Sequence, residues 1–308
     1  MNYQDTWING KVVSKGIREC NDRYKMIRGI CQKYKRPFTL LDIGANSGYF
    51  CIRGAIDFPE SVFIAVEPTY VDEILLSIKV NKLKNVVVLN DKLTVEKLNA
   101  LKSCSHFDIA LLLSVIHNFD EDIHDVYVAS KKLAEHVIYE MAVEKKSLGK
   151  KYEENNLIIN DLGVPDALIE SHVDPLKKRP MYCVKNNIDI KTTRYGTEYD
   201  FNGYVISNYE EKIYVSKRKN EERKWIPGIN LWTYIQLNGI YPTRGEIVSM
   251  IKDVKLEGHH DIRPWNLILG RGIYAIDVND PSHPVPHGKK EINDLINFIL
   301  SGKKEWIC

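Results

Sequence analysis

Short apolar runs alternate with helical patterns through the first half of the chain. The runs are rich in Val, Ile and Leu and are bounded by polar residues, glycine or proline, as expected of strands buried on both faces. The predicted strands are Thr39–Ile43, Val62–Val66, Val86–Leu89, Phe107–Leu113 and 136–140. Apolar residues recur at helical spacing between them, for example in Val71–Asn81 and in 123–134. This alternation predicts an α/β fold with a doubly wound, Rossmann-like sheet.

The segments on either side of these units have different patterns. Residues 16–34 show helical spacing and end before Pro37, which predicts a helix that leads into the first strand. Residues 145–185 are charged and interrupted by proline, and we expect them to form an excursion over the sheet edge rather than another βα unit. Alternating β-branched and aromatic positions then predict antiparallel strands that complete the sheet, at 190–199, 204–208 and 212–216.

The last part of the chain has its own pattern. The charged residues 217–224 are the predicted linker to it. Helices are expected at 229–237, 245–254 and 292–300. They surround two short apolar runs, Leu267–Leu269 and 273–278. We therefore expect a first domain of residues 1–219 and a smaller, mainly helical module of residues 220–308.

The composition narrows the possible classes of function. The 308 residues are 44% hydrophobic and 27% charged, which is typical of a globular protein with a core. The net charge of +2 gives no indication of nucleic-acid binding. No run approaches the roughly 18 apolar residues of a membrane span, and the first residues are polar, so we expect a cytoplasmic protein. The six cysteines form no C-x-x-C pair, so reduced thiols are expected rather than a zinc site.

A glycine turn follows the first predicted strand, in the sequence LDIGANSGYF of residues 41–50. Glycines there allow a ligand to approach the backbone, and the following helix presents unpaired N–H groups. The spacing Asp-x-Gly-x-x-x-Gly differs from the G-x-G-x-x-G of a dinucleotide site. Because Asp42 ends the strand, the pattern predicts a ligand with a cationic or hydroxyl group. The alternative is a turn that only packs a helix on a strand.

Polar residues also follow the next strands. Glu67 ends the second strand, where its carboxylate can accept two ribose hydroxyls, and Asn90 and Asp91 end the third, near an expected adenine amino group. Ser114 and His117 follow the fourth strand. Since the carboxyl ends of parallel strands meet at one edge of a sheet, we expect these residues to surround one pocket.

Taken together, DIGANSGYF, Glu67 and FDIALLLSVIHNF resemble the class I S-adenosylmethionine-dependent methyltransferases, over about residues 16–216. The resemblance implies S-adenosyl-L-methionine as the cofactor, with its methionine end at the glycine turn and its ribose at Glu67. Its adenine would contact Asp91, with Asn90 as the alternative. The expected cofactor-binding residues are Asp42, Gly44, Asn46, Gly48, Tyr49, Glu67, Asn90, Asp91 and Ser114.

Methyl transfer to an alcohol oxygen requires alignment with the methyl carbon and a nearby base. His117 is the first candidate for this base, and a structural histidine is the alternative. Glu140, which ends the fifth strand, is the second candidate. The leading helix carries Arg18, Arg23 and Tyr24, which are expected to form a lid over the cofactor or a solvated helix face.

A second motif lies in the C-terminal module, His259-His260-Asp261-Ile262-Arg263-Pro264-Trp265-Asn266 followed by a second acid. It resembles the catalytic loop of aminoglycoside phosphotransferase-like kinases. The resemblance implies that Asp261 orients an attacking hydroxyl and that Asn266 and Asp277 hold Mg²⁺. No glycine-rich loop or phosphate-binding lysine pattern precedes Trp225, so we expect a kinase C-lobe without its N-lobe.

This order of modules is similar to that of the bifunctional methyltransferase-kinases that cap bacterial O-antigen polysaccharides. It implies an O-methyltransferase that acts on a saccharide or sugar phosphate. The alternatives are an active kinase-methyltransferase and a non-catalytic binding protein. The basic clusters Lys145-Lys146, Lys150-Lys151 and Lys177-Lys178-Arg179 would then contact an anionic acceptor, unless they are only solvated.

Overall fold

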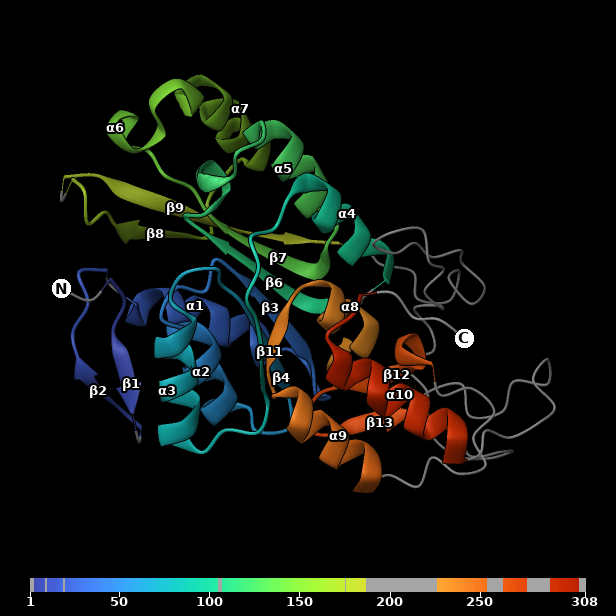
Figure 1. Ribbon diagram of the computed structural model, residues 1–308. Coiled ribbons are helices and arrows are strands. Elements are labelled where there is room, and N and C mark those ends of the chain that lie inside the picture. Colours follow the sequence, from blue (N-terminus) through green and yellow to red (C-terminus); the bar gives the residue numbers. More distant parts are fainter. Residues whose placement is uncertain are drawn as a thin grey trace.

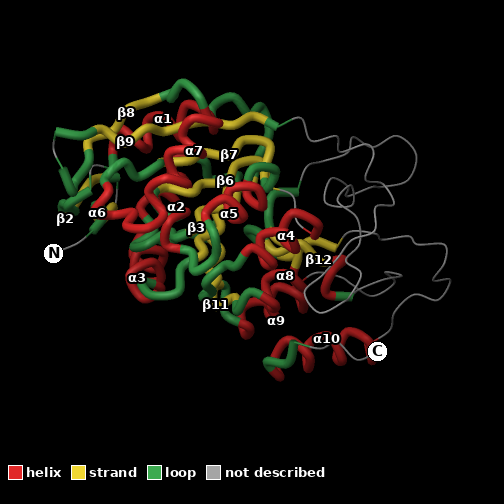
Figure 2. Tube along the Cα trace, turned by 90° about the horizontal axis from the view of Figure 1, so that it is seen from above, coloured by secondary structure: helices red, strands yellow, loops and turns green. Residues whose placement is uncertain are grey.

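A central sheet organises the protein, as the computed structural model shows in Figures 1 and 2. The structure describes residues 3–8, 10–18, 20–104, 107–174, 176–186, 226–253, 263–275 and 289–304. The strands predicted within 190–216 and the linker predicted at 217–224 lie outside these residues.

Helices and strands alternate along most of the chain. The helices are α1 (Asn21–Cys31), α2 (Tyr49–Asp57), α3 (Val71–Asn81), α4 (Val95–Cys104), α5 (Ile123–Ser130), α6 (Lys145–Leu148), α7 (Tyr152–Leu162), α8 (Leu231–Gln236), α9 (Arg244–Asp253) and α10 (Lys289–Ser301). The strands are β1 (Thr6–Ile8), β2 (Lys11–Ser14), β3 (Thr39–Ile43), β4 (Val62–Val66), β5 (Val86–Leu89), β6 (Phe107–Leu113), β7 (Ala134–Glu140), β8 (Ala167–Glu170), β9 (Lys178–Lys185), β10 (Ile229–Asn230), β11 (Gly239–Tyr241), β12 (Leu267–Leu269) and β13 (Ile273–Ala275).

The main sheet has the order β11-β5-β4-β3-β6-β7-β9-β8. Strands β3 to β7 are parallel to one another, and β9 and β11 pair antiparallel with β7 and β5. Successive units run outward in opposite directions from β3 and β6. This topological switch point is where open α/β sheets bind ligands, at the carboxyl ends of the strands. The predicted doubly wound α/β fold is confirmed.

Helices cover both faces of the sheet, because its central strands alternate apolar side chains between two cores. Leu40 belongs to the core under α1, α2 and α3, whereas Leu41 belongs to the core under α4, α5 and α7. Every residue of β3, β4 and β5 is buried. Strands buried on both faces are continuous apolar runs, which explains why the sequence predicts the bounds of β3, β4, β5 and β6.

The expectation for residues 145–185 is wrong in part, because this segment contains β8 and β9, which extend the sheet beyond β7. Strand β9 is not recognisable in the sequence because both of its ends are charged. Its terminal residues Lys178 and Lys185 are exposed, while Met181 and Tyr182 are buried. Two further elements are too short to show a hydrophobic periodicity in the sequence: the hairpin of β1 and β2, and the edge strand β11.

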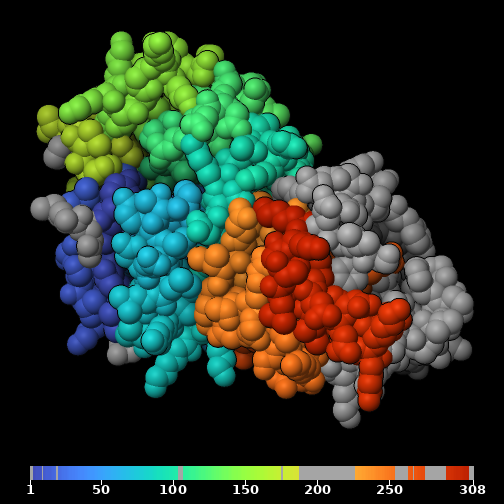
Figure 3. All heavy atoms as spheres, viewed as in Figure 1, coloured from blue at the N-terminus to red at the C-terminus, as the bar shows by residue number. Residues whose placement is uncertain are grey.

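The C-terminal region packs directly on this sheet. Strand β11 forms its outer edge, and α8, α9 and α10 share one apolar core with β3, β4 and β6. Trp232 of α8 is buried, with its ring 6.1 Å from that of Phe298 and stacked on it. Figure 3 shows the orange and red C-terminal residues against the teal part of the surface. The division into residues 1–219 and 220–308 stays a prediction.

Candidate functional site

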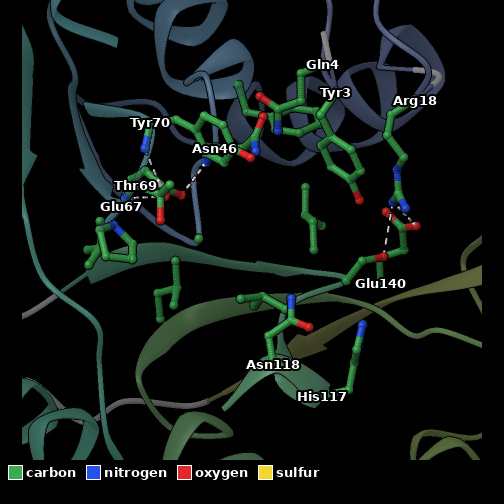
Figure 4. A pocket seen from close by; sticks show the side chains of 18 of the residues that line it. Tyr3, Gln4, Arg18, Asn46, Glu67, Thr69, Tyr70, His117, Asn118 and Glu140 are labelled. Carbon is green, nitrogen blue, oxygen red and sulfur yellow. Dashed lines mark hydrogen bonds and ion pairs between the residues drawn. The ribbon is translucent and has the colours of Figure 1, made fainter. Parts of the chain in front are cut away.

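A pocket of about 520 Å³ opens at the carboxyl ends of β3, β4, β6 and β7. Its size is within the usual range for small-molecule sites. Figure 4 shows Glu67 at one end of the pocket, Arg18 and Glu140 at the other, and His117 and Asn118 beside the space between them. The sequence prediction of one pocket at this sheet edge therefore agrees with the position of the cavity.

The glycine turn after β3 forms part of the pocket wall. Gly44 and Asn46 line the pocket, and both have left-handed backbone, with φ of 74° and 53°. A Cβ on Gly44 would lie 2.6 Å from Cγ2 of Val115, so a side chain does not fit there. Gly48, with φ of 81°, begins α2 next to Ile74 and is not part of the lining.

Two predicted cofactor-binding residues lie behind this turn and outside the pocket lining, Asp42 and Tyr49. Asp42 is buried, with Oδ2 3.8 Å from Sγ of Cys51. Burial raises the pKa of Asp42 to about 7; the thiol contact opposes this rise and the charge of Glu67 adds to it. The Tyr49 hydroxyl accepts a hydrogen bond from Arg53 at 2.6 Å. Direct contact with a ligand in the pocket is therefore not supported for either residue.

Glu67 lies at the pocket surface with its carboxylate fixed by backbone N–H groups. Oε2 accepts from Asn46 N at 2.8 Å, and Oε1 accepts from Thr69 N at 2.8 Å and from Tyr70 N at 3.3 Å. Figure 4 shows these bonds as dashed lines. A carboxylate offers about four acceptor positions, so Glu67 retains capacity for a ligand hydroxyl.

Asp91 lies at the same end of the pocket, and its carboxylate is also held in place. Oδ1 accepts from Lys97 Nζ at 2.5 Å, and Oδ2 accepts from Nδ2 of Asn238 at 3.1 Å. Asn90 is exposed and does not line the pocket. Of the two alternatives that the sequence left open, the structure brings Asp91 to the cavity.

The other end of the pocket contains a buried ion cluster around Glu140. Oε1 accepts from Arg18 at 2.6 Å, and Oε2 accepts from Arg23 at 2.6 Å. Burial acts to raise the pKa of Glu140, but the hydrogen bonds and charges of Arg23 and Arg18 outweigh it and lower the pKa to about 2. This corrects the prediction that Glu140 is a base, since its oxygens are occupied and its proton affinity is low.

Of the two roles expected for the leading segment, the solvated helix face is wrong, and the lid over the cofactor stays a prediction. Arg18, Arg23 and Tyr24 are all buried, so they are not a solvated helix face. Arg18 lies before α1, and both arginines belong to the pocket wall. The Tyr24 hydroxyl donates to Asp57 at 2.9 Å and does not line the pocket.

Ser114 connects this ion cluster to a second buried ion pair. Its Oγ accepts from Arg18 at 3.1 Å and from Arg179 at 2.9 Å. Arg179 also donates to Glu144, with Nη2 at 2.8 Å from Oε2. The three arginines carry one more charge than Glu140 and Glu144 together, so this end of the pocket has an excess of one positive charge.

His117 and His172 lie beside these charges. Burial and the nearby arginine charges together lower the pKa of each to about 4. Both imidazoles are therefore neutral at pH 7. Nδ1 of His172 accepts from Arg18 at 3.0 Å, whereas Nδ1 of His117 is buried without a hydrogen-bond partner among the described residues. His117 lines the pocket, but its lowered pKa and its buried Nδ1 make it a weak base, so its role as proton acceptor stays a prediction.

The kinase-like site stays a prediction, because Asp261, Asp277 and the side chain of Asn266 lie outside the described residues. In the same described ranges, no group of three His, Cys, Asp or Glu side chains could hold a metal ion. None of the described helices is long and apolar enough to cross a membrane.

Two residues near the start of the chain form a part of the pocket that no sequence pattern indicates. Tyr3 and Gln4 line the pocket, and Arg18 N donates to Tyr3 O at 3.0 Å. Gln4 Oε1 accepts from Tyr49 N at 3.2 Å, which satisfies an N–H group at the start of α2. Polar residues in a terminal segment have no periodicity that marks them as a pocket wall.

Several known structures resemble this chain, although no family model and no curated protein matches it. The complex of WbdD with the kinase inhibitor LY294002 has a TM-score of 0.48 and 16% identity, over 85% of this chain and 76% of that one. The bifunctional kinase-methyltransferase WbdD has a TM-score of 0.45 and 16% identity, over 93% of this chain and 81% of that one. A putative O-methyltransferase from Klebsiella pneumoniae has a TM-score of 0.43 and 12% identity, over 55% of this chain and 82% of that one. Identities of this size do not establish function, which has to be inferred from the site.

Replacement of Glu140 by glutamine tests the buried ion cluster. The variant leaves two buried arginines without their counterion, so the free energy of unfolding at pH 7 should fall by about 3–5 kcal/mol. Because the pKa of Glu140 is lowered from 4.5 to about 2, its stabilisation is present above pH 4.5 and is lost as the pH falls towards 2. Urea unfolding between pH 3 and pH 7 should therefore show a weaker pH dependence in the variant.

Asp120→Asn is the matched control, because Asp120 forms an exposed ion pair with Lys92. This control should have nearly the stability of the unmodified protein at pH 7. An Asp120 variant as unstable as the Glu140 variant, or unchanged pH dependence in Glu140→Gln, would contradict the assignment.

Proposed function

We propose that the protein is an S-adenosylmethionine-dependent O-methyltransferase whose acceptor is a saccharide or sugar phosphate. One observation carries the proposal: a single pocket at the topological switch point has acidic residues at one end and a net positive ion cluster at the other. A nucleoside cofactor and an anionic acceptor require such opposite ends, which favours transfer between them over simple binding of one small molecule.

The acidic end is suited to the adenosine part of the cofactor. Glu67 has acceptor capacity for one ribose hydroxyl, and Asp91 for the adenine amino group. Gly44, without a side chain, and the left-handed Asn46 allow the backbone to approach the cofactor. When bound, S-adenosylmethionine supplies a methyl group on a positively charged sulfur.

The positive end is suited to an anionic group of the acceptor. Arg18 and Arg179 both line the pocket, and their positive charge favours a phosphate or carboxylate group, while Nε and Nη2 of Arg179 hold Glu144. Their positions are fixed by Glu140, Glu144 and Ser114, so little side-chain freedom is lost when the acceptor binds. A sugar phosphate fits this end better than a neutral sugar.

His117 and the arginines together define how the acceptor oxygen becomes a nucleophile. With the cofactor bound, the acceptor oxygen would form a bond to the methyl carbon as the carbon–sulfur bond breaks, and the sulfur would keep that electron pair. If the acceptor is a hydroxyl group, His117 is the candidate for its proton, but the pKa of about 4 makes this imidazole a weak base and favours an acceptor that is already ionised. If it is an ionised phosphate oxygen, no proton is transferred, and the arginines align the oxygen.

Replacement of Glu67 by glutamine tests the cofactor end. The variant keeps the shape of the side chain but loses its charge, so the affinity for S-adenosylhomocysteine in isothermal titration should fall about 10- to 100-fold. Glu73→Gln changes an exposed glutamate on α3 and is the matched control, with unchanged affinity expected. Failure of the unmodified protein to bind S-adenosylhomocysteine, or equal binding by Glu67→Gln, would contradict the proposal.

Replacement of Arg179 by lysine tests the acceptor end. Lysine keeps the charge but not the planar set of donors, so turnover of phosphorylated sugars should fall at least about tenfold while cofactor affinity stays the same. Mass spectrometry of sugar phosphates and their neutral counterparts measures the transferred methyl group. Arg36→Lys, at an ion pair with Asp108 outside the pocket, serves as the control.

Two results would count against this acceptor assignment. One is equal methylation of phosphorylated and neutral sugars by the unmodified protein. The other is the same loss of turnover in the Arg36 and Arg179 variants, because only Arg179 lines the pocket.

A further inference from the structure

Strand β11 brings a residue of the C-terminal region to the acidic end of the pocket. Asn238 lies between α8 and β11, immediately before the antiparallel pairing of Gly239 with Leu89 of β5. The carbonyl oxygen of Asn238 accepts from Asn90 N at 3.1 Å. The backbone of Asn238 is therefore attached to the residue that directly precedes Asp91.

The side chain of Asn238 contacts the carboxylate that we assign to the adenine end. Its Nδ2 donates to Oδ2 of Asp91 at 3.1 Å, while Lys97 donates to Oδ1 at 2.5 Å. Each carboxylate oxygen thus has one donor from a different side, and these two contacts fix the rotation of the carboxylate plane. Asp91 lines the pocket and is only 7% exposed, whereas Asn238 does not line it.

The backbone at this position explains why the residue is asparagine. Asn238 has φ of 50°, in the left-handed region that asparagine, aspartate and glycine adopt at little cost. Glycine would supply no donor, and aspartate would place a second negative charge next to Asp91. Of these three residue types, asparagine combines the backbone conformation with an amide donor.

We infer that Asn238 is a positioning residue of the cofactor site, which orients the carboxylate of Asp91 toward the adenine amino group. This inference rests on the proposed function. It also assigns part of the methyltransferase pocket to the region that carries the kinase-like motif. Recognition of the adenine amino group then depends on a residue that does not itself line the pocket.

Asn238→Gly is the sharpest variant, because it keeps the left-handed backbone and removes only the donor. The probes are S-adenosylhomocysteine and S-inosylhomocysteine, in which a carbonyl oxygen replaces the adenine amino group. The unmodified protein should prefer the adenine compound, since Asp91 accepts from the amino group and repels the oxygen. In Asn238→Gly, affinity for the adenine compound should fall about 3- to 10-fold, and affinity for the inosine compound should change less than about twofold.

Tyr241→Phe is the matched control on the same strand. It removes the hydrogen bond from the Tyr241 hydroxyl to Leu83 O, 3.2 Å long, and leaves Asp91 untouched. Its preference for the adenine compound should equal that of the unmodified protein. Asn238→Asp tolerates the same backbone and should lower the preference further, so it tests the inference if the glycine variant folds poorly.

Three results would overturn the inference. An unchanged preference in both Asn238 variants would show that Asn238 does not orient Asp91, while leaving the proposed function intact. An equal loss in Tyr241→Phe would assign the effect to the strand as a whole. Failure of the unmodified protein to bind either compound would instead reject the proposed cofactor, and this inference with it.

Discussion

The buried carboxylate of Glu140 is the interaction on which one end of the pocket depends. It is fully buried at the end of β7, where it binds Arg18 before α1 and Arg23 within α1. A buried charge of either sign is costly without its partner, so these three groups stabilise one another only as a set. Through Ser114, the set also extends to Arg179 of β9. Segments far apart in sequence are thereby held at the same pocket wall.

The architecture of the sheet places the acidic end and the positive end of the pocket along one sheet edge. Glu67 and Glu140 both follow or end parallel strands, so they lie at the same sheet edge on either side of the switch point between β3 and β6. Their environments differ: backbone N–H groups surround Glu67, and guanidinium groups surround Glu140. One carboxylate therefore stays available to a ligand, while the other serves to hold arginines in place.

Much of the fold could be predicted because buried parallel strands leave a clear pattern. The bounds of β3, β4, β5 and β6 follow from continuous apolar runs, and acidic residues directly after such strands indicate a pocket at their ends. Asp42 shows the limit of this reasoning, because a position near the end of a strand does not determine whether a side chain lines the pocket. Short elements such as β11 and hidden ones such as β9 lack a usable periodicity. The ion cluster and the contact of Asn238 with Asp91 join partners separated by 122 and 147 positions in the chain, and no local pattern encodes such pairs.

A crystal structure of the protein with S-adenosylhomocysteine tests the central claim most directly, because the claim concerns which end of one pocket holds which ligand. We expect a ribose hydroxyl at Glu67, the adenine amino group at Asp91, and the sulfur facing the Ser114 and Arg179 end. Electron density for the compound in the reverse orientation, or outside this pocket, would contradict it.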